Sequence, residues 1–350
     1  MRLRAGLRHA LASAALVLGL CCPAIASEVA PVQHFAVSSR PITQFRIGHD
    51  EARFGPLEFV GGLEMTAAAR DFGGLSAFRF LKPGSEFIGV ADTGFWFFGA
   101  ILRDAEGRPA GIADFSMQQM VDKMGRPIDR KWEADAEALA VKGDVATVGF
   151  ERDHRVAQFR IDRSDMKGPF RLLDFLVPVR ELRKNRGFET VAYAAADGPL
   201  KGSAVVVSEK SLDAEGNMFA AVLDGPRKGV FTVRRSGEFD ITDGAFLPDG
   251  DLLVLERSFS ILGGLRMQMR RLDRDSIGKG RLADGPVLMQ ADLGYQIDNM
   301  EGLDVWRRGD GATMVSLISD DNQSILQRSL YLEFILRDYE RQASGSQPKS

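Results

Sequence analysis

Acidic side chains stand at both ends of short apolar segments in this sequence. In residues 298–322, Glu301 opens one apolar segment, and Asp320 and Asp321 close the next, with a Gly-Asp-Gly turn between the two. Carboxylates held a few ångström apart repel each other, and their pKa values rise unless cations compensate them. Either a hard cation such as Ca²⁺ or the guanidinium groups of nearby arginines can do so. The chemistry indicated is binding of a metal ion or of an anion such as phosphate.

The same acidic pattern occurs in five successive stretches of the chain. They begin at Gly73, Glu137, Glu189, Asp243 and Glu301, and each is followed by a turn-like stretch and an apolar run that ends in an acidic residue. Internal repetition at about 50 to 60 residues is typical of repeat architectures. The carboxylates of the pattern are Asp92, Glu137, Glu151, Glu189, Glu209, Asp243, Glu256, Glu301, Asp320 and Asp321.

The repeated units are rich in predicted strands. Residues 145–153 and 251–260 are short, contain Val, Leu and Phe, and are bounded by turn-forming residues, whereas helical periodicity is weak throughout. Four strands per unit indicate the blades of a propeller. The chain is therefore predicted to be an all-β protein, a β-propeller with five recognisable four-stranded blades. A sixth, degenerate blade and a β-sandwich remain open alternatives.

The last unit supplies only three predicted strands. Residues 57–65, which precede the first unit, are predicted to supply the fourth by pairing the N-terminal and C-terminal strands, which would close the ring and remove exposed sheet edges.

Antiparallel pairing predicts where the acidic residues meet. If the segment that opens each unit is the innermost strand, its first residue and the last residue of the next strand lie at the same mouth of the channel. Glu137, Glu189 and Glu301 are then candidate catalytic residues. The alternative is that acids at strand ends bond backbone N–H groups and lock the blades together. The candidate metal ligands are Asp92, Glu151, Glu209, Asp243, Glu256, Asp320 and Asp321.

Basic residues accompany the acids in several units. Arg152 and Arg257 directly follow Glu151 and Glu256, and guanidinium groups bind carboxylate and phosphate oxygens in a bidentate manner. For these pairs the alternative is a salt bridge between blades, and a lone histidine is otherwise a hydrogen-bonded loop residue. The candidate substrate-binding residues are Arg152, His154, Arg155, Lys210 and Arg257.

The first 26 residues have the features of a secretory signal peptide. A basic leader precedes the apolar run 10–20, which is too short to span a bilayer, and residues 24–26 form an Ala-Ile-Ala cleavage site. A membrane anchor is the alternative. We expect a periplasmic or secreted protein with no stable membrane span after cleavage. The expected regions are an irregular segment at 27–54, the propeller at 55–340 and a disordered tail at 341–350.

Charge and cysteine content narrow the function. Without residues 1–26, the chain has 42 Lys and Arg against 48 Asp and Glu, so a nucleic-acid partner is not expected. Both cysteines, Cys21 and Cys22, lie in the predicted leader, which excludes thiol catalysis and cysteine-bound metals from the mature chain. We expect a monomer that acts on a small anionic or phosphorylated substrate.

Several blocks of the sequence resemble a known family. They are FGGLSAF with FIGVADTG, DAEALAV with GFERDHRV, NRGFETVAY, DITDGAFLPDGDLLVLERSFS, and DNMEGLDVW with SLISDDN. In this order, from about residue 55 to 336, they resemble the phytase-like family described as "esterase-like activity of phytase". The resemblance implies an exported bacterial propeller that hydrolyses phosphate or other esters, by similarity to propeller phytases whose clustered calcium ions bind phosphate. It supplies no catalytic residues position by position.

Two functions are consistent with these features. The first is a metal-assisted phosphoric-ester or other ester hydrolase, with Ca²⁺ as the candidate cofactor at the carboxylates. The second is a propeller without catalytic activity that binds a charged ligand or a protein partner in the cell envelope. Calcium would then stabilise the fold without turnover.

Overall fold

The computed structural model describes residues 31–182, 187–261 and 263–337. The predicted signal peptide and the predicted tail at 341–350 lie outside these residues. Within them, no helix is long and apolar enough to cross a membrane.

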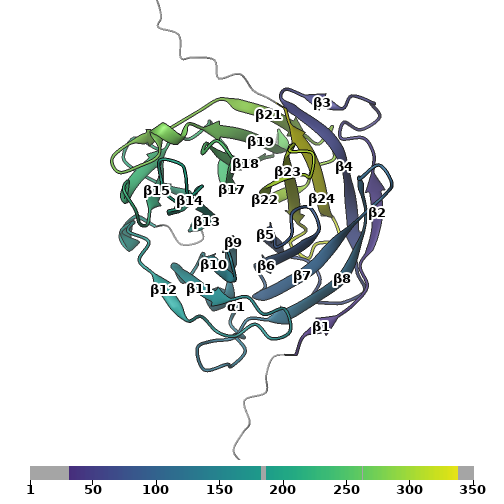
Figure 1. The fold of residues 1–350 in the computed structure, drawn as a ribbon, viewed down its shortest axis with the longest axis horizontal. Coiled ribbons are helices and arrows are strands. Elements are labelled where there is room, and N and C mark those ends of the chain that lie inside the picture. The colour runs from purple at the N-terminus through teal and green to yellow at the C-terminus, as the bar shows by residue number, and fades with distance from the viewer. Residues whose placement is uncertain (1–30, 183–186, 262, 338–350) are drawn as a thin grey trace, which may run out of the picture.

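Five β-sheets are arranged around a central axis (Figure 1). Blades 1 and 2 are joined by a connection that contains the short helix α1 (Lys131–Ala134). Blade 1 contains β5 (Leu75–Phe80), β6 (Glu86–Ala91), β7 (Phe95–Arg103) and β8 (Pro109–Gln119), with β1 (Gln33–His34) at its outer edge. Blade 2 contains β9 (Ala136–Lys142), β10 (Val145–Phe150), β11 (Arg155–Arg160) and β12 (Arg171–Leu173).

The next two blades have the same antiparallel order from the axis outward. Blade 3 contains β13 (Phe188–Tyr193), β14 (Ala204–Leu212), β15 (Met218–Val222) and β16 (Gly229–Val233), with β20 (Leu282–Ala283) added in parallel. Blade 4 contains β17 (Asp240–Phe246), β18 (Leu252–Ser260), β19 (Gly264–Leu272) and β21 (Val287–Asp292). The 3-10 helices are η1 (Val179–Glu181) and η2 (Arg274–Ser276).

The last blade joins the two ends of the chain. It contains β22 (Asn299–Arg307), β23 (Thr313–Asp320), β24 (Ser329–Leu336) and β4 (Leu57–Thr66), with β2 (Ser38–Ile42) and β3 (Arg53–Phe54) paired to β4. β4 runs antiparallel to β24, from Leu57 opposite Leu336 to Met65 opposite Ser329. The predicted closure by residues 57–65 is therefore confirmed.

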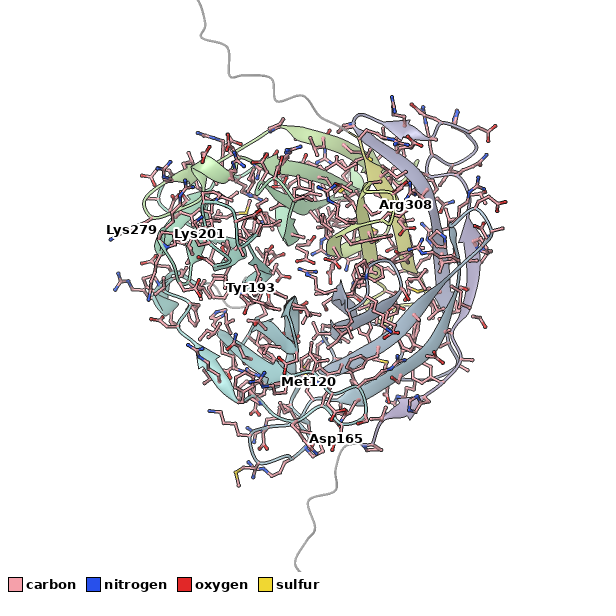
Figure 2. The ribbon with its side chains drawn as sticks, viewed as in Figure 1. Met120, Asp165, Tyr193, Lys201, Lys279 and Arg308 are labelled. Atoms are coloured by element: carbon pink, nitrogen blue, oxygen red, sulfur yellow. The ribbon has the colours of Figure 1, made fainter. Side chains whose placement is uncertain are left out.

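The innermost strands contact one another around the axis in the order β5, β9, β13, β17 and β22, and β22 contacts β5 again. This ring confirms the five-bladed propeller, and the described residues form no sixth blade. Side chains fill the spaces between neighbouring sheets (Figure 2). One example is the buried Trp96 of blade 1, whose ring lies 5.0 Å from that of Phe159 in blade 2 in a T-shaped arrangement. The apolar core is thus divided among the interfaces between blades.

The segment before the propeller is more regular than expected. Its described part contains β1, β2 and β3, and β2 adds an edge strand to the closing blade. Pro41 of β2 lies opposite Leu63, and an edge position suits proline because proline has no N–H to donate to a further strand.

Candidate metal centre

Each innermost strand has one residue that its pairing with the second strand skips. This residue lies between two paired residues, so each of the five blades contains a bulge at the same level. A bulge re-aims a side chain and is frequent beside functional sites. The skipped residues are Ser76, Glu137, Glu189, Thr242 and Glu301.

The second strands supply a matching set of residues. In each blade, one residue of the second strand pairs with the residue just before the bulge. The residue that directly follows this second-strand residue in the sequence is the one that matches the bulge residue. Four of these five residues are acidic, and blade 4 supplies the only basic one. They are Asp92, Glu151, Glu209, Arg257 and Asp320.

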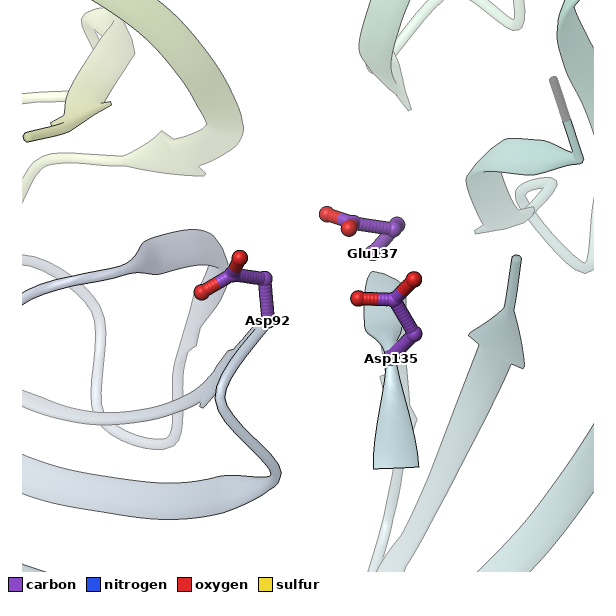
Figure 3. Close-up of side chains that lie close together, drawn as sticks. All are labelled: Asp92, Asp135 and Glu137. Carbon is purple, nitrogen blue, oxygen red and sulfur yellow. The ribbon is translucent and has the colours of Figure 1, made fainter. Parts of the chain in front are cut away.

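One group of three carboxylates lies between blades 1 and 2. Oxygen atoms of Asp92, Asp135 and Glu137 lie within 4.8 Å of one another, and Figure 3 shows Asp135 and Glu137 on one side and Asp92 on the other. The rim supplies partial compensation, because Lys131 Nζ lies 2.6 Å from Asp92 Oδ2 and Arg152 Nε lies 2.7 Å from Asp135 Oδ2. Burial nevertheless raises the pKa of Asp135, against the lowering effect of Arg152 and Lys131.

A second group of three carboxylates lies between blades 2 and 3. Oxygen atoms of Glu151, Glu189 and Glu209 lie within 4.8 Å of one another, and the three residues are only 7 to 8% exposed. Among the residues that the structure describes, none donates a hydrogen bond to the Glu189 carboxylate. A buried carboxylate without donors is costly unless a cation or a proton neutralises it. This group has the form of a cation site.

Arg257 and Glu301 form an ion pair beside the second group. Arg257 Nη1 lies 3.1 Å from Glu301 Oε1, and Arg257 Nη2 lies 3.9 Å from Glu209 Oε1. Glu301 Oε1 also accepts a hydrogen bond of 2.8 Å from Asn299 Nδ2. Burial by itself would lower the pKa of Arg257, but the surrounding Glu301, Glu209 and Glu189 raise it. The guanidinium is therefore held in its charged form by the carboxylates.

Burial and mutual repulsion raise the pKa values of several carboxylates at the mouth. Burial, followed by repulsion from neighbouring carboxylates, raises the pKa of Glu137 and Glu189 well above the usual value. Burial raises the pKa of Glu301 to about 7, against the lowering effect of Arg257. Burial, Glu301 and Asp92 raise the pKa of Asp320 to about 9. These shifts favour the neutral, protonated forms of the carboxylates, and a bound cation would oppose them.

The metal-free protein is therefore expected to lose stability as the pH rises. The pKa values of Asp320 and Glu301, about 9 and about 7, lie above the ordinary 3.8 and 4.5, so the folded state binds these protons more tightly than the unfolded state. The resulting stabilisation is complete below the ordinary values and is lost as the pH rises through the raised ones. Thermal unfolding with a chelator should give a falling Tm between about pH 5 and about pH 9. A Tm that rises throughout this range would contradict the raised values.

Asp243 lies in the channel and not with the groups at the mouth. Its carboxylate is fully buried and accepts two hydrogen bonds of 2.8 Å from Arg79, one on each oxygen. It also accepts backbone N–H groups of Leu303 and Gly244. The reason is a shift of one residue, because the bulge residue of blade 4 is Thr242 and Asp243 follows it. The expectation that Asp243 binds a metal is therefore corrected to a structural ion pair.

Glu256 and Asp321 also have structural partners. Glu256 accepts hydrogen bonds from Gln268 and Arg270 within blade 4, because alternation along β18 turns it away from the side on which Arg257 lies. Asp321 accepts the backbone N–H of Gly74 at 3.1 Å and the hydroxyl of Ser329 at 2.8 Å, so it joins blade 5 to the start of blade 1. Both were expected to bind a metal, and the structure instead shows them bracing the sheets.

The predicted basic residues do not form one set. Arg152 lies at the rim beside Asp135, whereas Lys210 Nζ lies 2.8 Å from Asp240 and so points toward the next blade. Arg155 Nη1 bonds Asp153 at 2.8 Å, and its guanidinium lies 3.7 Å from the centre of the Phe150 ring. Burial lowers the pKa of the half-buried His154, which Asp153 partly offsets.

Arg257 is the predicted basic residue that lies beside Glu301 and Glu209, whereas Arg152 pairs with Asp135 of the first group. The residue that sequence reasoning missed is Asp135. It directly follows α1, and the Asp-Ala-Glu order at the start of β9 was the available signal.

Comparisons with known proteins identify the family to which the chain belongs. No curated protein sequence matches the chain significantly. Similar solved structures include the PQQ-bound aldose sugar dehydrogenase of Streptomyces coelicolor, with 12% identity, coverage of 81% of this chain and 99% of that chain, and a TM-score of 0.44. The endo-arabinase of Bacteroides thetaiotaomicron has 10% identity, coverage of 78% and 96%, and a TM-score of 0.47. The family profile described as "Esterase-like activity of phytase" matches residues 70–323, and the chain therefore belongs to this phytase-like family.

Proposed function

We propose that the chain is a metal-assisted hydrolase of phosphoric esters whose carboxylate mouth binds Ca²⁺ or a similar hard cation. The observation that carries this function is the Glu189 carboxylate, which is 7% exposed and lies with oxygens of Glu151 and Glu209 within 4.8 Å. No described residue donates a hydrogen bond to it. Hard cations bind several carboxylate oxygens at such sites. The same chemistry applies to Asp92, Asp135 and Glu137.

The donor atoms fit this choice of metal. Both groups consist of carboxylates, which suit calcium, whereas zinc prefers histidine and cysteine. Bound calcium would polarise a phosphoryl oxygen and lower the pKa of a nearby water. In this proposal, residues 1–26 are removed and the protein acts in the periplasm or outside the cell. Millimolar calcium in these compartments can occupy sites of modest affinity.

The residues of the chain supply the remaining chemistry. Arg257 lies beside Glu301 and Glu209, and once cations neutralise the carboxylates its planar guanidinium can bind two phosphoryl oxygens. Glu301 contributes to the raised pKa of both Glu137 and Glu189, so it faces both groups. Its Oε1 accepts bonds from Asn299 and Arg257, and we assign to Oε2 the acceptance of a proton from the attacking water.

Replacement of Arg257 by methionine separates substrate binding from metal binding. We expect kcat/KM for a phosphomonoester to fall by about 100-fold, because two charge-assisted hydrogen bonds are lost. Calcium affinity should stay the same or increase, since a competing cation is removed. The assays are hydrolysis of phenyl phosphate and calorimetric titration with calcium. The control is Lys210→Met, which removes the lysine paired with Asp240 and should leave kcat/KM unchanged.

Chelation tests the metal requirement directly. A chelator should abolish hydrolysis, and added calcium should restore it. Hydrolysis that survives chelation would contradict the metal site. Calcium that raises the Tm without turnover of any phosphate or carboxyl ester would contradict the enzyme and support the envelope propeller that binds a ligand.

A further inference from the structure

A largely apolar cavity of about 380 Å³ lies between blades 1 and 2. Its inner wall contains Met120, Phe150 and Phe159, all at most 2% exposed, and its outer wall contains Trp132 and Leu172. Figure 2 labels Met120 in this part of the molecule, and Figure 1 places α1 beside β10 and β11. The volume lies within the range of about 300 to 1,000 Å³ that is usual for small-molecule sites.

Large apolar side chains are exposed around the opening of this cavity. Trp132 is 48% exposed and Leu172 is 50% exposed. Phe170, two residues before Leu172, is also 50% exposed. Exposed apolar side chains that gather at one opening indicate a ligand-binding groove, whereas isolated ones are ordinary.

The cavity adjoins the carboxylate groups at two points. Trp132 and Glu133 of α1 line it, and Asp135 of the first group follows directly after this helix. Phe150 lines it from the end of β10, and the next residue, Glu151, belongs to the second group. Each junction spans one or two residues, so the cavity lies next to both carboxylate groups along the chain.

Arg155 forms part of the wall that separates the cavity from solvent. Its guanidinium stacks on the Phe150 ring at 3.7 Å, donates to the backbone oxygen of Glu133 and bonds Asp153. These partners hold Arg155 against α1 and the start of β11. Its sequence-based assignment to phosphate binding is thereby replaced by a role in shaping the cavity.

We propose that this cavity receives the aromatic or other apolar group of the ester, while the phosphoryl group lies at the carboxylate mouth. The inference rests on the function proposed above and names its substrate class, a phosphoric monoester of an aromatic or long-chain alcohol. Burial of the apolar group against Trp132, Phe150 and Leu172 supplies binding energy remote from the reacting bond.

The test uses two phosphonates that cannot be hydrolysed and that differ only in the apolar group. Benzylphosphonate should bind the calcium-loaded protein about tenfold more tightly than methylphosphonate, because it buries an added aromatic ring. In the double variant Trp132→Ala, Leu172→Ala, this ratio should fall to about twofold or less, with the affinity for methylphosphonate unchanged. Titration calorimetry measures both. The control is Leu102→Ala, which removes a leucine of equal exposure, 50%, on β7.

Trp132 provides a second readout. Trp96 is fully buried and Trp306 is 8% exposed, so a shift of tryptophan emission to shorter wavelength on adding benzylphosphonate reports on Trp132. If methylphosphonate binds in a calcium-dependent manner and benzylphosphonate binds no more tightly, this inference alone is overturned. If methylphosphonate does not bind at all, the mouth is not a phosphate site, and the inference falls with the proposed function.

Discussion

The Glu189→Gln variant is expected to bind calcium about 100-fold more weakly than the unchanged protein, while its calcium-free form unfolds at a higher temperature. Both effects follow from one fact. The Glu189 carboxylate is buried between Glu151 and Glu209 without a hydrogen-bond donor among the described residues. A glutamine there removes a charge that repels its neighbours and also removes a metal-binding oxygen.

The opposite signs of these two effects distinguish a metal site from a brace. Thermal unfolding with chelator and with calcium gives both quantities in one experiment, and titration calorimetry gives the dissociation constant. A suitable control is Glu86→Gln, because Glu86 is partly exposed and pairs only at the surface with Lys82. If Glu189→Gln unfolds at a lower temperature without calcium, the carboxylate stabilises the fold by itself and the cation site is refuted.

Two rules were enough to predict the fold and to predict that most of the repeated acidic side chains lie at one mouth. The repeated acidic positions established the five blades, and antiparallel pairing placed the start of the first strand and the end of the second at one mouth. The structure brings together Asp92, Glu137, Glu151, Glu189, Glu209, Glu301 and Asp320 in this way. The missing strand of the last unit likewise predicted β4 as the partner of β24.

In blade 4 the repeat was aligned to the wrong residues, one residue too late in β17 and one residue too early in β18. An alignment by residue type matches Asp243 to Glu189 and Glu256 to Glu209. The strand pairing instead places Thr242 at the position of Glu189 and Arg257 at the position of Glu209. Because side chains alternate along a strand, a shift of one residue changes the face on which each side chain lies. A bulge has no signature in the residue types of this sequence, so the alignment could not reveal it.

Asp135 was missed for a different reason. It belongs to no repeat, and its place beside Asp92 depends on α1, a single helical turn in the connection between two blades. Arg257 was predicted, but its position as the basic member of an otherwise acidic set became visible only with the pairing of β17 and β18.

The Asp243→Ala variant should be destabilised by about 3 to 5 kcal/mol, because it leaves the buried Arg79 guanidinium without a carboxylate. Arg79 is 6% exposed, and it also donates to the backbone oxygens of Leu303 and Gly244. It comes from β5, and Asp243 comes from β17, which is not its neighbour in the ring, so the pair ties together strands on different sides of the channel. Urea unfolding at neutral pH measures the loss.

Calcium binding decides whether Asp243 is structural or belongs to the site. Asp243→Ala, once folded, should bind calcium with unchanged affinity, whereas Glu189→Gln should not. The double variant Arg79→Met, Asp243→Leu should recover part of the lost stability, since no unpaired charge remains in the channel. A variant at Asp243 that folds normally but no longer binds calcium would mean that the carboxylate acts at the mouth.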